Sequence, residues 1–114
     1  MEKEIASKPY VVCKEFIESR KRIYEYTLDV FGYFQAERYK QKIRHSLDTL
    51  SIFYLAYPEC RHLATKSRMY RNIILDAHLI IYRITETRIE VLDIIHAASS
   101  IRKIRNVRKV HLKI

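Results

Sequence analysis

The sequence has 114 residues, which is enough for one domain and too few for two. Apolar residues make up 48% of it, with one Gly and two Pro, a composition that excludes a disordered or loop-rich chain. The net charge of +9 indicates an anionic partner. No apolar run is long enough for a membrane span and no secretory leader is recognisable, so we expect a cytoplasmic protein with no membrane contact and with Cys13 and Cys60 as free thiols.

The first elements predicted along the chain are a short strand and a helix. Residues 8–13 form an apolar run with Pro9 at its entrance, which favours an edge strand because proline cannot donate to a ladder. From about Lys14 the spacing is helical, and Gly32 follows where a left-handed C-terminal cap would end the helix. The stripe predicted to face the core contains Phe16, Ile17, Ile23, Tyr24, Thr27 and Phe31.

A second helix is predicted directly after Gly32. Its apolar positions recur at intervals of three and four residues, and the tight link predicts an antiparallel helical hairpin. Pro58 disfavours helix at Tyr57 and is expected to end it. The apolar positions are Ala36, Tyr39, Ile43, Leu47, Leu50 and Tyr54.

The chain then changes to strand-like segments over residues 70–75, 78–84 and 88–95, which are rich in Ile, Val, Leu and Tyr. Their polar breaks are short, which favours an antiparallel β-meander. The predicted fold is α+β, in the order β-α-α-β-β-β, with the helices on one face of the sheet. In the tail, the apolar residues first recur every three positions, at Ile101, Ile104, Val107 and Val110, which favours a helical turn or two over the sheet edge. They then recur every two positions, at Val110, Leu112 and Ile114, as in a strand.

Several strings, in their order and spacing, resemble toxins of the RelE/ParE superfamily. Residues 23–39 are similar to that family's helix–Gly–helix segment, and residues 57–59 to its proline-bearing exit. Residues 70–83 are similar to its central hairpin, and residues 89–96 to its last strand, which ends in His. The resemblance covers roughly residues 9–100 and implies one toxin domain over 1–114, with an N-terminal helical hairpin packed on the meander and a basic tail at 101–114.

The resemblance implies two modes of action: RelE-like ribosome-dependent mRNA endonucleases and ParE-like inhibitors of DNA gyrase. RNA cleavage requires an acid, a base and positive charge at the phosphate, for which the candidate residues are Arg68, Arg71 and His96. Where the nuclease branch places a basic residue and Tyr after the last strand, this chain has Ala97, Ala98, Ser99 and Ser100. We therefore predict a ParE-like toxin that acts by binding; the alternatives are an mRNA endonuclease and, third, a basic RNA-binding domain.

The resemblance also implies a cognate antitoxin, whose acidic, partly disordered segment would fold over the toxin. Two acid-free clusters, residues 61–71 and 101–114, hold the whole excess of positive charge. No cofactor motif is recognisable, and His and Cys never fall at metal-ligand spacing. The residues predicted to bind the target or the antitoxin are Arg61, Lys66, Arg68, Arg71, Arg83, Arg102, Lys103 and Arg105.

Overall fold

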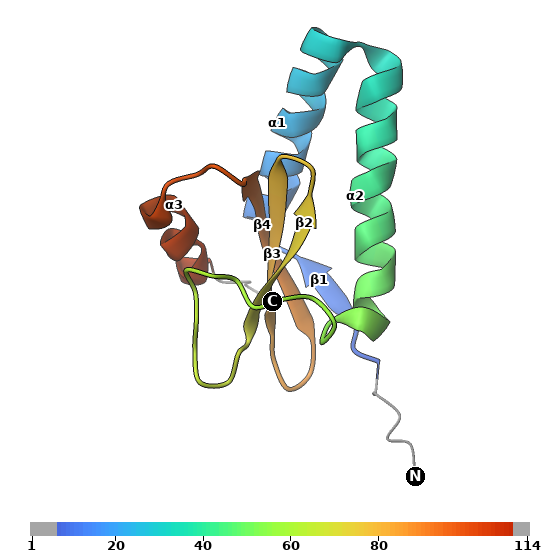
Figure 1. Ribbon diagram of the computed structural model, residues 1–114. Helices are drawn as coiled ribbons and strands as arrows, with labels where there is room; N and C mark the ends of the chain where they lie inside the picture. Colours follow the sequence, from blue (N-terminus) through green and yellow to red (C-terminus); the bar gives the residue numbers. More distant parts are fainter. Residues whose placement is uncertain (1–6, 111–114) are drawn as a thin grey trace.

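The computed structural model describes residues 7–110, which fold into a four-stranded sheet with helices on both faces (Figure 1). None of the helices within these residues is long and apolar enough to cross a membrane. The elements in chain order are β1 (Tyr10–Val12), α1 (Lys14–Phe31), α2 (Tyr33–Phe53), β2 (Tyr70–Leu75), β3 (His78–Ile84), β4 (Ile89–His96), α3 (Ile101–Asn106) and a short 3-10 helix, η1 (Val107–Lys109).

The sheet has the strand order β1-β4-β3-β2, and its last three strands form the predicted antiparallel meander. β1 is an edge strand, as predicted, and pairs with β4 in parallel, so the sheet is mixed. The helical hairpin connects β1, at one edge of the sheet, with β2, at the other edge. A bulge interrupts the β3–β4 ladder: Ile81 pairs with Asp93 and Tyr82 pairs with Val91, which leaves Leu92 as the extra residue.

Gly32 alone joins the two long helices. Its N–H donates to the carbonyl of Leu28 and its carbonyl accepts from the N–H of Ala36, so one residue caps both helices. Its φ of 88° with ψ of 176° lies outside the left-handed helical region that we predicted, in a region open essentially to glycine. α2 ends at Phe53, ahead of Pro58, because the chain leaves through a turn in which the N–H of Ala56 donates to the carbonyl of Phe53.

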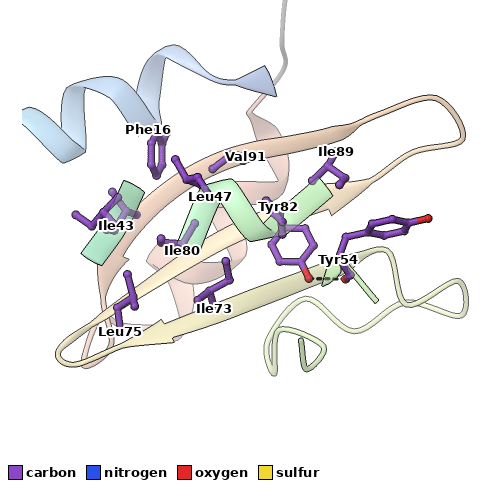
Figure 2. Packing of buried hydrophobic residues seen from close by; sticks show 12 residues of the cluster. Phe16, Ile43, Leu47, Tyr54, Ile73, Leu75, Ile80, Tyr82, Ile89 and Val91 are labelled. Atoms are coloured by element: carbon purple, nitrogen blue, oxygen red, sulfur yellow. Dashed lines mark hydrogen bonds between the residues drawn. The ribbon is translucent and has the colours of Figure 1, made fainter. Parts of the chain in front are cut away.

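The main core lies between the hairpin and one face of the sheet (Figure 2). Phe16 and Leu47 from the helices pack in one cluster with Ile80 and Tyr82 from β3, and the Tyr82 hydroxyl donates to the carbonyl of Tyr54 at 2.6 Å. The predicted apolar stripe of α2 is confirmed, since all its members are buried or half-buried. In α1 two predicted members, Ile17 and Phe31, are exposed, Phe31 because the hairpin tip projects beyond the sheet (Figure 1).

The second face of the sheet is also covered, which corrects the prediction of helices on one face only. Ile81 and Ile95 pack there against Ile104 and Val107 of the tail and against Leu63 of the loop between α2 and β2. The tail is helical, as favoured, but it lies on this face because its apolar side chains meet the sheet's alternate residues. Residues 112 and 114, on which the strand alternative depended, lie outside the described residues.

Candidate functional site

A cleft of about 640 Å³ opens between the helical hairpin and the end of the sheet. Its walls come from α1, α2, the β2–β3 turn, the end of β4 and α3. Apolar and aromatic side chains line much of it, among them Ile23, Tyr26 and Phe31 of α1, and Tyr26 and Phe31 are largely exposed. A concave surface with apolar walls and a few polar groups is the usual form of a binding site.

Two histidines face each other in the cleft because they are partners in the β3–β4 register. The rings of His78 and His96 are 5.6 Å apart, and the hydroxyl of Tyr39 lies 2.7 Å from Nδ1 of His78. Burial, with a contribution from His96, lowers the pKa of His78 below its ordinary value. Burial also raises the pKa of Tyr39 to about 12. On the other side, His96 accepts a hydrogen bond at Nδ1 from the N–H of Ala98 at 3.0 Å.

A polar chain links α1 to β4 on the cleft wall. The Ser19 hydroxyl donates to Asp93 Oδ1 at 2.6 Å, and it accepts a hydrogen bond from the Arg22 guanidinium at 3.0 Å. Burial raises the pKa of Asp93, although the hydrogen bonds from Ser19 and from the Ile94 N–H oppose this effect. Lys103 of α3 lines the cleft as well, so Arg22 and Lys103 bring positive charge to a largely apolar hollow.

The structure does not bring the three predicted nuclease residues together. Arg71 pairs in register with Tyr82, whereas His96 pairs with His78 at the opposite end of the meander. The Arg71 guanidinium donates to the carbonyls of Leu55 and Tyr57 at 3.1 and 2.9 Å, so it holds the exit from α2. Arg68 lies in the loop before β2 and forms an ion pair with Glu59.

Arg83, which we predicted as a binding residue, is an interior group. Its side chain is 11% exposed, and its Nη2 lies 2.6 Å from Glu90 Oε1. Glu90 also accepts a hydrogen bond at Oε2 from Arg88 Nη2, at 2.7 Å. Arg83 Nη2 donates in addition to the carbonyl of Val110 at 3.2 Å. Arg83 is buried because alternate residues of β3 point to the second face of the sheet, where the tail covers them.

The remaining predicted binding residues, Arg61, Lys66, Arg102, Lys103 and Arg105, are exposed. Our sequence reasoning did not assign a role to Tyr39 or Arg22 in a site, and it did not place His78 beside His96. One sequence signal could have predicted this pairing of histidines. The short breaks after Leu75 and Ile84 place the first residue of β3 opposite the last residue of β4.

Within residues 7–110 no group of three His, Cys, Asp or Glu side chains is placed to hold a metal ion.

Comparison with known proteins identifies a protein family and a solved structure with a similar fold. Residues 10–101 match the model of a family described as the ParE toxin of the parDE type II toxin–antitoxin system. The fold is similar to a solved structure described as a chromosomal ParDE toxin–antitoxin system from P. aeruginosa, with a TM-score of 0.66 and 15% sequence identity. The similarity covers 81% of this chain and 98% of that chain, and at this identity it concerns the fold. No curated protein sequence matches the chain.

Proposed function

Because the chain belongs to the ParE toxin family of type II toxin–antitoxin systems, we propose that it inhibits growth by binding DNA gyrase in the cytoplasm. The toxin domain spans the whole chain, with the core that we predicted at about 9–100 and the basic tail as part of the same unit. The cognate antitoxin holds it inactive until that antitoxin is lost.

The observation that favours binding over cleavage is the position of the predicted catalytic arginines. RNA cleavage needs positive charge beside the phosphate, within reach of the acid and the base. Arg71 is engaged with two backbone carbonyls, and Arg68 is paired with Glu59. Neither shares the end of the sheet that carries His96. A toxin built this way acts through its surface.

The cleft is the proposed receiver of the antitoxin. Its apolar walls suit an amphipathic segment that folds on binding, and Arg22 and Lys103 suit acidic side chains on that segment. Arg22→Glu is expected to weaken the complex with the cognate antitoxin by about ten-fold or more, because a like charge would then face the acidic segment. The matched control is Arg38→Glu, an exposed residue of α2 outside the cleft.

The target is tested by adding the purified chain to a gyrase supercoiling reaction and, separately, to ribosomes translating a defined message. We expect loss of supercoiling and an intact message. His96→Gln should leave gyrase inhibition unchanged, as should His45→Gln, its control on the exposed surface of α2. An intact supercoiling reaction beside a cleaved message would contradict the proposal.

One observation favours the endonuclease as a second candidate. The cleft gathers His78 and His96 with two cations, Arg22 and Lys103, a set that differs from the one expected from the sequence. Imidazoles titrate near neutrality and can exchange protons with a reacting hydroxyl. If this set cleaves RNA, message cleavage will vanish in His96→Gln and persist in His45→Gln.

A further inference from the structure

The two basic segments of the sequence lie side by side on the second face of the sheet. Leu63, from the loop before β2, belongs to the same buried cluster as Ile104 and Val107 of the tail. Figure 1 shows this loop running close to α3, on the side of the sheet away from the hairpin. Segments that are some forty residues apart in the chain thus share one surface.

We call this surface the basic face. Its cations come from the loop and from the tail, and all are exposed. Only Arg68 among them forms an ion pair with an acid of residues 7–110, namely Glu59. The face therefore presents a concentrated, largely uncompensated positive charge. Its members are Arg61, Lys66, Arg68, Arg102, Arg105, Arg108 and Lys109.

The chemistry of the basic face separates it from the cleft. A protein segment that folds on binding needs apolar surface to bury, and the large exposed apolar side chains lie mostly on the hairpin. On the basic face the tail exposes one such residue, Ile101. A phosphate backbone needs cations and no apolar pocket. The basic face thus fits a nucleic acid better than an acidic peptide.

We propose that the basic face binds the phosphate backbone of duplex DNA. Single strands are held largely by stacking on aromatic rings, and the large exposed aromatic side chains of residues 7–110 lie on α1 and α2. A duplex offers two backbones to cations that are spread over two segments. The choice of DNA over RNA rests on the proposed target, an enzyme whose substrate is duplex DNA; the phosphate contact itself does not depend on that target.

The test is binding of the full chain to a labelled 20-base-pair DNA duplex across a salt series, in the absence of any other protein. Each phosphate contact contributes about −0.9 to the slope of log affinity against log salt concentration. One contact therefore contributes about eight-fold in affinity at about 0.1 M salt relative to about 1 M salt. Arg102→Gln with Arg105→Gln is expected to weaken binding by tens of fold and to flatten the slope by about 1.8. Arg61→Gln with Lys66→Gln should do the same, because both segments contribute.

The charge-matched control is Arg38→Gln with Arg44→Gln on the exposed surface of α2, which should leave the slope unchanged. An equal loss in this control would overturn the proposal, because the binding would then follow net charge alone. Tighter binding of a polyglutamate peptide would overturn it in favour of an acidic protein. Binding of an RNA duplex or a single strand as tight as that of the DNA duplex would overturn the choice of DNA. The supercoiling reaction is a separate measurement, so either proposal can fail alone.

Discussion

At the scale of single residues, the most consequential group is the buried carboxylate of Glu90. It accepts hydrogen bonds from both Arg83 and Arg88, and its side chain is only 8% exposed. Burial alone would raise the pKa of Glu90, but the hydrogen bonds from Arg88 and Arg83 outweigh burial and hold it below the usual range. Burial removes water from the charges of Glu90 and Arg83. The buried pair is tolerated because the hydrogen-bonded ion pair compensates for this lost hydration.

Glu90→Gln is therefore expected to lower the free energy of unfolding by about 3–5 kcal/mol, because Arg83 stays buried with no countercharge. Urea denaturation followed by circular dichroism measures the change. Glu86→Gln, in the exposed turn between β3 and β4, is the control and should have little effect. A loss below about 1 kcal/mol in Glu90→Gln would mean that water reaches the Arg83 guanidinium.

His78 makes stability depend on pH. Because burial and His96 lower its pKa in the folded state, the folded protein binds fewer protons than the unfolded chain near an ordinary histidine pKa of about 6.5. Stability should therefore fall as the pH drops below about 6.5 and level off below the folded-state pKa. His78→Gln should flatten this part of the profile of unfolding free energy against pH, whereas the exposed His45→Gln should keep it. An unchanged slope of unfolding free energy against pH in His78→Gln would show that another group causes the pH dependence.

At the scale of elements, the helical hairpin depends on the one residue that joins its helices. A Cβ added at Gly32 would meet nothing within 4 Å, so a substitution there is resisted by the backbone alone, with φ at 88° and ψ at 176°. The hairpin tip around Gly32 carries exposed aromatic residues and projects beyond the sheet (Figure 1).

Gly32→Ala is expected to cost about 1–3 kcal/mol of stability, because an L-residue is strained in this conformation. Thermal unfolding detects it as a lower Tm, with Gln35→Ala, an exposed position of α2, as the control. A wild-type Tm in both variants would contradict the prediction. It would mean that the backbone at residue 32 can change its conformation with no loss of stability.

At the scale of the whole molecule, the sheet is the middle layer of three. The hairpin covers one face, and the tail with the loop before β2 covers the other, so the tail is part of the core. Two buried thiols belong to this second cluster, and burial raises the pKa of Cys13 to about 11. Helix α3 contributes to both surfaces, with Lys103 in the cleft and Arg102 and Arg105 on the basic face.

Ending the chain after Ser100 is expected to lower the free energy of unfolding by roughly 3–6 kcal/mol, because Ile104 and Val107 each contribute about 1.5–3 kcal/mol by burial. The truncated protein should also bind a hydrophobic dye, since Ile81 and Ile95 lose their cover. Arg102→Gln with Arg105→Gln serves as the comparison and should change neither readout, because both side chains are exposed. A truncation of wild-type stability would show that the tail is dispensable for the core.

The sequence by itself determined the order and the type of the elements. The apolar spacing from Ala36 to Tyr54, the single glycine and the short breaks in the meander are local signals, and local geometry converts them directly into a hairpin and three strands. The family resemblance followed from the same strings, and the match over residues 10–101 confirms it.

Only the tertiary structure decided what each face of the sheet meets. Arg83 appears in the sequence as one more cation; it becomes an interior ion pair because the tail lies over its side of β3. Likewise, His78 and His96 meet through strand register, and the two basic segments join because Leu63 and Val107 share a core. Such contacts join residues that are distant in the chain, and no local pattern specifies which segment will cover which face.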